Sequence, residues 1–214
     1  KTVQAQIGVS FEITNLYEEM TAAENLTLFA RLFGMSGFEP RPLLDRVGLG
    51  GRGQDRVASY SKGMKQRLMV ARALVNQPKI LFLDEPTEGL DPNSAKAIRA
   101  IIEEERERGA TVFLTTHDMV EADKLSDRVA FLNQGKIEAL DTPRNLKQRY
   151  GRRMLKAEVT VNGSLETREV ALDGEDTAAK VEDLFRTENV VTVHSEEATL
   201  EDIFIQITGR ELVG

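Results

Sequence analysis

The stretch KILFLDEPTEGLD, residues 79–91, guides the interpretation of the whole chain. Its four apolar residues at 80–83 have the length and composition of a buried strand. They run directly into two carboxylates, Asp84 and Glu85. Because an unpaired charge beside an apolar core is costly, the pattern predicts a compensating partner such as a metal ion or a polarised water. Taken alone, the pattern fits a solvated strand end equally well. Other parts of the chain must therefore distinguish a functional site from a solvated strand end.

The composition limits the functions to consider. The chain has 214 residues, 41% of them hydrophobic, and a formal net charge of −7, which gives no reason to expect nucleic-acid binding. Because it has no cysteine and only two histidines, it cannot form a disulfide framework or a histidine-rich metal site. We find no apolar run of the roughly 18 residues that a membrane helix needs, and no signal-peptide core. We therefore expect a soluble intracellular protein that reaches a membrane only through a partner.

Strands and helices alternate downstream of residue 79. The pattern predicts a strand at 80–83, a helix at 92–109, a strand at 111–116 and a short helix at 119–126. Strands that alternate with helices indicate a parallel sheet with crossover connections. A further strand is expected at 5–11.

The region between the first two predicted strands is mainly helical. Thr21 followed by Glu24 is a capping-box pattern at the start of a helix, and Ser61 stands near the start of another. We expect this helical subdomain to cover about residues 20–75.

The character of the chain changes near residue 150. Before it, residues 128–140 are predicted to form a hairpin that turns at 133–135, and after it a second hairpin is predicted to turn at Asn162 and Gly163. Two short helices around a strand complete the tail. We therefore predict an α/β domain at 1–150 and a small α+β appendage at 151–214.

The glycine-rich segment GLGGRG, residues 48–53, is a misleading motif. It matches G-x-G-x-x-G and begins like a phosphate-binding loop, but Gln54 and Asp55 stand where that loop needs Lys and Ser or Thr. Both motifs require a preceding strand and a following helix, which the surrounding sequence does not supply. We expect a flexible surface loop.

Several polar residues lie where they could bind a metal ion or phosphate, or take part in catalysis. Asp84, at the carboxyl end of a parallel strand, could hold Mg²⁺ beside a nucleotide, and Glu85 could polarise an attacking water. Ser61 and Gly63 at a helix N-terminus could contact phosphate, although an ordinary N-cap is the commoner reason for such a serine. His117 ends the next strand, where a lone histidine is usually structural.

In order and spacing these stretches resemble the ATP-binding subunits of ABC transporters. YSKGM at 60–64 resembles their signature motif, ILFLDE at 80–85 the Walker B strand, EGLD at 88–91 the D-loop, and TTHD at 115–118 the switch histidine. The stretch at 7–26 resembles the Q-loop and the entry to the helical subdomain. The forms SKGMKQR and ATLEDIFIQITG resemble the drug- and polysaccharide-exporting (ABC-2 type) branch.

The resemblance implies a P-loop NTPase-like α/β fold with a mainly parallel sheet and a helical subdomain. It also implies ATP and Mg²⁺ as cofactors, a homo- or heterodimer with another ATP-binding subunit, and a separate membrane subunit through which export is powered. The protein would lie in the cytoplasm, peripheral on the inner face of the membrane, and would bind no nucleic acid.

The resemblance also assigns roles to residues. Glu85 would activate water, with His117 contacting the γ-phosphate, while Asp84 and Glu12 would ligate the metal. The remaining nucleotide contacts and the coupling of the two sites would fall to Ser61, Lys62, Gly63, Met64 and Asp91.

The sequence departs from the family in three places. No phosphate-binding (Walker A) segment precedes the strand at about residue 5, Glu12 replaces the usual glutamine, and Lys62 and Met64 replace the common Gly and Gln. We therefore expect these residues alone to bind ATP poorly. The alternative is a non-catalytic dimer partner or a degenerate regulatory fragment.

Overall fold

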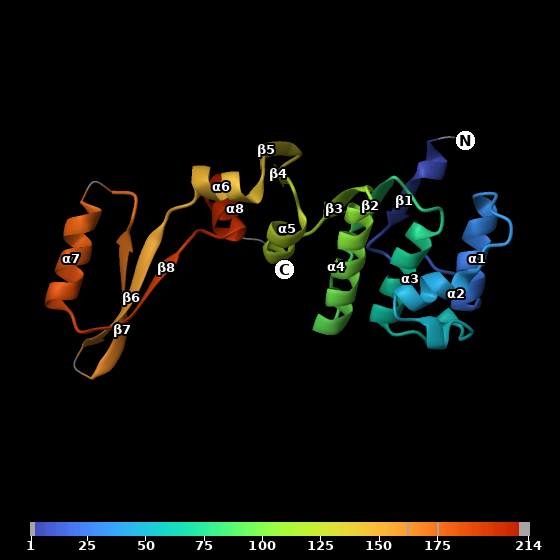
Figure 1. The fold of residues 1–214 in the computed structure, drawn as a ribbon, viewed down its shortest axis with the longest axis horizontal. Helices are drawn as coiled ribbons and strands as arrows, with labels where there is room; N and C mark the ends of the chain where they lie inside the picture. Colours follow the sequence, from blue (N-terminus) through green and yellow to red (C-terminus); the bar gives the residue numbers. More distant parts are fainter. Residues whose placement is uncertain (1–2, 162, 175, 210–214) are drawn as a thin grey trace. The chain divides into compact units, whose positions relative to one another are not determined.

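The computed structural model describes residues 3–161, 163–174 and 176–209 (Figure 1). The chain forms two compact units, which divide between His117 and Asp118. No helix among the described residues combines the length and hydrophobicity needed to span a lipid bilayer.

A parallel sheet is the centre of the first unit. Its strands are β1 (Ile7–Ser10), β2 (Ile80–Asp84) and β3 (Thr111–Thr115), in the order β1–β2–β3. In this register Asp84 pairs with Thr115. The parallel sheet predicted from the alternating pattern is thus confirmed, and the carboxyl ends of all three strands meet at one edge. The first strand is shorter than expected because a 3₁₀ turn occupies Gln4–Gln6.

Helices cover one face of this sheet. Leu81 and Leu83 of β2 are buried, whereas the alternate residues of that strand are exposed. Helix α3 (Lys62–Leu74) contacts β1 and β2, and helix α4 (Pro92–Glu107) contacts β3. The closest approach is at Gly8, where an added Cβ would lie 2.1 Å from the carbonyl oxygen of Ala73. Only glycine at this position lets β1 and α3 meet so closely.

The predicted helical subdomain is present as α1 (Ala22–Leu32), α2 (Pro40–Arg46) and α3. The capping box at the start of α1 forms as expected, because Thr21 and Glu24 each accept a hydrogen bond from the other's backbone N–H. The glycine-rich segment contains the 3₁₀ turn Gly50–Arg52 and follows helix α2 rather than a strand. Its context is therefore not that of a phosphate-binding loop.

The first part of the second unit is a hairpin packed against three helices. The hairpin strands are β4 (Val129–Asn133) and β5 (Lys136–Asp141), and the helices are α5 (Met119–Leu125), α6 (Pro143–Tyr150) and α8 (Leu200–Thr208). The predicted turn before residue 136 is confirmed. The core residues are Ala122, Val129, Phe131, Ala139, Leu146, Leu200 and Ile203.

An antiparallel sheet forms the rest of the second unit. Its strands β6 (Met154–Val161), β7 (Ser164–Ala171) and β8 (Val190–Glu196) lie in the order β7–β6–β8, with α7 (Thr177–Thr187) packed on it. The predicted hairpin between β6 and β7 is confirmed, although its turn residue Asn162 lies outside the described residues.

The C-terminal helix complicates the predicted domain boundary near residue 150. Leu200 and Ile203 of α8 complete the core formed by residues 122–146, although residues 151–199 separate them in sequence. The compact units divide after His117 instead. The division into 1–150 and 151–214 therefore stays a prediction.

Candidate functional site

The carboxyl edge of the β1–β2–β3 sheet holds the residues on which the candidate site depends. Asp84 is the last residue of β2 and is exposed. The hydroxyl of Thr115, its neighbour on β3, donates a hydrogen bond to Oδ1 of Asp84 over 2.5 Å. This bond fixes the direction of the carboxylate. Thr115 was not singled out from the sequence, although it stands two residues before His117 in the same strand ending.

The backbone changes direction abruptly at Glu85. Its φ of +44° lies in the left-handed region, which a residue with a Cβ adopts only when its surroundings impose it. The Glu85 N–H donates to the carbonyl oxygen of Thr115 over 3.1 Å, so the chain stays attached to β3 while it leaves the strand. Strained conformations of this kind concentrate at functional sites.

Glu85 and His117 are in direct contact. Nδ1 of His117 lies 3.0 Å from Oε1 of Glu85. Because an ionised carboxylate only accepts hydrogen bonds, a hydrogen bond between these two atoms requires the proton to be on Nδ1. The Glu85 side chain is 20% exposed and that of His117 46% exposed, so solvent reaches the pair. The sequence placed both residues at one sheet edge, and the structure joins them.

The residues present suit a magnesium ion shared with a nucleotide rather than a protein-only metal site. Among the described residues, no group of three or more His, Cys, Asp or Glu side chains gathers as a metal-binding cluster. Mg²⁺ in nucleotide sites takes only one or two carboxylates, with phosphates and waters supplying its other ligands. An exposed Asp84, held by Thr115, fits that mode.

Glu12 lies just beyond the last residue of β1 and is exposed. Strand register places this segment at the same edge as Asp84, because Ser10 pairs with Leu83. The buried Asn25 anchors the segment further along, since its side chain donates to Tyr17 O over 3.0 Å and accepts from Tyr17 N. The anchoring role of Asn25 was not recognised from the sequence.

The N-terminus of α3 presents the second group of predicted residues. Ser61 is the N-cap, and its hydroxyl accepts a hydrogen bond from Met64 N–H over 3.3 Å. The backbone N–H of Gly63 lies in the same first turn. An added Cβ on Gly63 would lie 3.4 Å from Ser94 Oγ, so this turn lies beside the start of α4. Lys62 extends toward Gly89 in the turn before α4.

Asp91 caps α4. Its Oδ1 accepts hydrogen bonds from the N–H groups of Asn93 and Ser94 over 3.0 and 3.1 Å. Hydrogen bonds from the Ser94 side chain and backbone, followed by the Asn93 N–H, lower the pKa of Asp91 below its ordinary value. The structure thus shows a structural role for Asp91, and its predicted role in coupling two sites stays a prediction.

With this geometry established, the similarity to known proteins identifies the family. The family model described as ABC transporter matches residues 1–88. A fluoroquinolones export ATP-binding protein of Mycobacterium tuberculosis is 48% identical over 208 residues, which cover 97% of this chain and 69% of that protein. The chain belongs to the ABC transporter family.

Other relatives of this ABC transporter chain agree. The Nod factor export ATP-binding protein I of Burkholderia pseudomallei is 35% identical, over 97% of this chain and 74% of its own. The lantibiotic transport ATP-binding protein SrtF of Streptococcus pyogenes is 37% identical, over 70% of this chain and 67% of its own.

Solved structures confirm the P-loop NTPase-like fold. An ATP-binding subunit of an ABC transporter matches with a TM-score of 0.63 and 33% identity, over 70% of this chain. A dimeric ATP-binding cassette bound to ADP and Pi matches with a TM-score of 0.59 and 29% identity, over 64% of this chain. The chain spans 64% and 62% of these two solved chains. The prediction of an ABC-type ATPase domain is confirmed at the level of the family.

Proposed function

We propose that this chain is the ATP-hydrolysing component of an exporter and that Glu85 activates the attacking water. The observation that carries the proposal is the 3.0 Å contact between Glu85 and His117 beside Asp84. Three polar groups at the carboxyl edge of a parallel sheet match the needs of an in-line displacement at a phosphate. A solvated strand end would not require the strained backbone of Glu85.

Each residue has a distinct task in this proposal. Glu85 accepts the proton of the water, and the Nδ1–H of His117 holds the carboxylate in one orientation. Asp84, held by Thr115, and the exposed Glu12 would provide oxygen ligands for the cation. Mg²⁺ bound there would neutralise charge on the nucleotide phosphates.

Substitution of Glu85 tests this assignment. In the assembled transporter, we expect Glu85→Gln to lower ATP turnover about 10²–10⁴-fold, because the amide keeps the shape but cannot take a proton. Binding of MgATP, measured separately by calorimetry, should change little. Glu103→Gln removes an exposed carboxylate from the body of α4 and serves as the matched control, with turnover unchanged.

A second substitution tests the positioning role of His117. His117→Ala should lower turnover by releasing the Glu85 carboxylate, again with binding retained. If Glu85→Gln reduces binding and turnover by the same factor, Glu85 contributes to nucleotide affinity and the role of base is wrong.

The relatives suggest which proteins this chain binds. Those named above are ATP-binding proteins of export or transport systems, and one solved neighbour is dimeric. We infer that this chain pairs with another ATP-binding subunit and serves a membrane subunit from the cytoplasmic side. In that pair the first turn of α3, with Ser61, Lys62, Gly63 and Met64, would contact the nucleotide held by the opposite subunit.

The isolated 214 residues should bind MgATP weakly. They contain no G-x-x-x-x-G-K-S/T segment, the loop whose backbone N–H groups cradle phosphates. Calorimetry of MgATP against the purified chain is the measurement, and micromolar affinity would contradict this expectation.

A further inference from the structure

One segment of this acidic chain is strongly basic. Between Asp141 and Glu158 the sequence contains six Lys and Arg residues and no acidic residue, whereas the whole chain has a net charge of −7. The segment comprises α6 and the start of β6, far in sequence from the candidate ATP site. The proposed function uses none of its residues. A concentration of cations on one short segment attracts anions.

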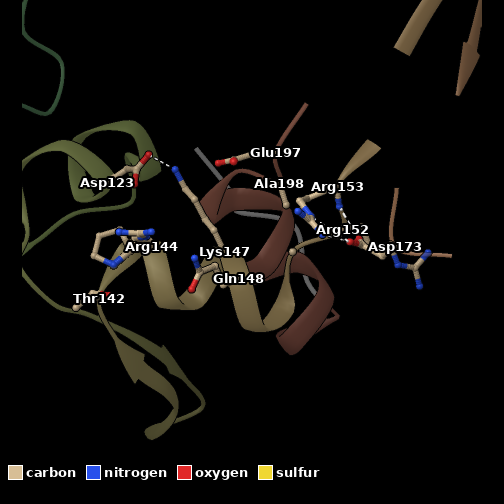
Figure 2. Close-up of a pocket in the computed structure, with 12 residues that line it drawn as sticks. Asp123, Thr142, Arg144, Lys147, Gln148, Arg152, Arg153, Asp173, Glu197 and Ala198 are labelled. Carbon is tan, nitrogen blue, oxygen red and sulfur yellow. Dashed lines mark hydrogen bonds and ion pairs between the residues drawn. The ribbon is translucent and has the colours of Figure 1, made fainter. Parts of the chain in front are cut away.

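Four of these cations line a hollow that lies wholly within the second unit (Figure 2). Its volume is about 780 Å³, within the range of pockets that hold small molecules. Helix α6 forms one wall with Arg144 and Lys147, and Arg152 and Arg153 follow where the chain leaves that helix. Segments distant in sequence close the hollow, so tertiary packing creates it.

Gly151 allows two of these walls to meet. An added Cβ would lie 2.9 Å from the Cβ of Ala198 in the segment before α8, and 2.4 Å from the carbonyl oxygen of Lys147 within α6 itself. The end of α6 and the segment before α8 therefore approach more closely than a larger residue would permit. The hollow is therefore shaped by close packing of these segments as well as by exposed side chains.

The ion pairs leave part of the positive charge unmatched. Lys147 pairs with Asp123 over 2.5 Å, and Arg153 pairs with Asp173 over 3.0 Å. Arg144 and Arg152 have no acidic partner in the part of the chain that the structure describes, and both are exposed. Among the described residues, the pocket therefore holds two cations whose charge is not balanced by a neighbouring ion pair.

Guanidinium groups indicate the chemistry of the ligand. Each presents a planar fork of N–H donors that matches phosphate oxygens in pairs, which an ammonium group cannot do. Glu197 also lines the hollow and has no cationic partner among the described residues, so it opposes anion binding at its end of the pocket. A ligand with a phosphate group at one end and a neutral or cationic part at the other could bind the arginines without being repelled by Glu197.

We propose that this hollow binds a phosphate-bearing ligand of small-molecule size, with Arg144 and Arg152 as its main contacts. The site goes beyond the proposed ATPase function, because it lies in the second unit and shares no residue with the sheet edge of the first. The phosphate could belong to a soluble organic phosphate or to a lipid headgroup. Both sources present the same group to the two arginines.

The test compares two double variants that remove the same charge. Arg144→Gln/Arg152→Gln removes the unmatched pocket cations, and Arg149→Gln/Lys136→Gln removes two exposed cations outside the pocket. Calorimetry with inorganic diphosphate at fixed salt should show binding that the first variant weakens at least about tenfold and the second leaves within about twofold. Circular dichroism checks that both variants fold.

A third variant changes the affinity in the opposite direction. Glu197→Gln removes the opposing carboxylate and should tighten diphosphate binding several-fold. Because a folding defect would not increase affinity, this variant keeps the proposal testable even if the arginine variant is unstable.

Vesicles distinguish the two sources of phosphate. Sedimentation with phosphatidylglycerol vesicles, against phosphatidylcholine alone, should show the same dependence on Arg144 and Arg152 if the natural ligand is an anionic headgroup. Binding of diphosphate alone, with that dependence, supports a soluble phosphate. The proposal is overturned if neither probe binds, or if the two double variants weaken binding equally.

Discussion

Glu85 has an unfavourable backbone conformation that its neighbours must hold in place. A left-handed φ costs a residue with a Cβ on the order of 1–3 kcal/mol, and a glycine would remove that cost. The hydrogen bond from its N–H to Thr115 O and the contact of its carboxylate with His117 hold the conformation in place. Retaining a carboxylate in a position suited to glycine is consistent with a chemical role for Glu85.

Asp91 allows a prediction about pH at the same scale. Its pKa is lowered in the folded chain by hydrogen bonds from Ser94 and then Asn93, so it stabilises the fold when ionised. That stability is present above the ordinary carboxyl pKa and is lost as the pH falls through the lowered folded value. Asp91→Ala should lower the melting temperature at neutral pH, and the difference from wild type should shrink in acid.

The matched control is Asp91→Asn, because asparagine caps helices without ionising. It should keep most of the stability at neutral pH and lose the pH dependence. Thermal melts followed by circular dichroism between neutral pH and about pH 3 compare the three proteins. A constant difference between Asp91→Ala and wild type across that range would show that the carboxylate charge is not what stabilises the cap.

At the scale of elements, two glycines on packed surfaces differ in whether the packing leaves room for a Cβ. Gly8 lies where β1 touches α3, and an added Cβ would lie 2.1 Å from a backbone carbonyl oxygen. Gly63 lies in the first turn of α3, where an added Cβ would make an ordinary contact at 3.4 Å with Ser94. Packing therefore requires glycine at position 8 and does not require it at position 63.

This contrast predicts opposite effects on stability. Gly8→Ala should lower the free energy of unfolding by about 1–3 kcal/mol, because β1 and α3 must separate. Gly63→Ala should leave it unchanged or raise it by up to about 1 kcal/mol, because alanine favours the helix. Urea denaturation measures both. Similar losses for the two variants would mean that Gly63 also has a packing role, which would weaken its assignment to nucleotide contact.

At the scale of the whole molecule, the first unit leaves one sheet face uncovered by the described residues. Phe82 and Phe113 lie side by side on it, with ring centroids 5.7 Å apart and exposures of 38% and 60%, and Ile80 is also exposed. An exposed apolar patch on a sheet favours association with other surfaces. We expect the purified 214-residue chain to self-associate through this face.

Threonine substitutions test that expectation. Phe82→Thr/Phe113→Thr should reduce light scattering and dye binding, because threonine keeps β propensity and removes apolar surface. Leu165→Thr/Phe185→Thr, which replaces two exposed apolar residues of the second unit, is the control and should have little effect. Equal effects of the two pairs would assign the association to general hydrophobicity.

The sequence by itself determined the local elements of this protein. The apolar run before Asp84, the capping box of Thr21 and Glu24, and the turn residues before Lys136 each specify structure within a few residues, and each element formed as predicted. The order of short motifs was also sufficient to indicate the ABC transporter family, because the motifs and the distances between them can be read directly from the sequence.

Only the tertiary structure decided which side chains meet. The contact of His117 with Glu85 depends on the register between β2 and β3 and on the left-handed turn at Glu85, and no local pattern encodes either. The docking of α8 onto the core around Phe131 and the hollow beside Arg144 and Arg152 likewise join segments far apart in sequence. The physical reason is that the hydrophobic effect is non-directional and stabilises any arrangement that removes apolar surface from water. Which arrangement is most stable therefore depends on the packing of the whole chain.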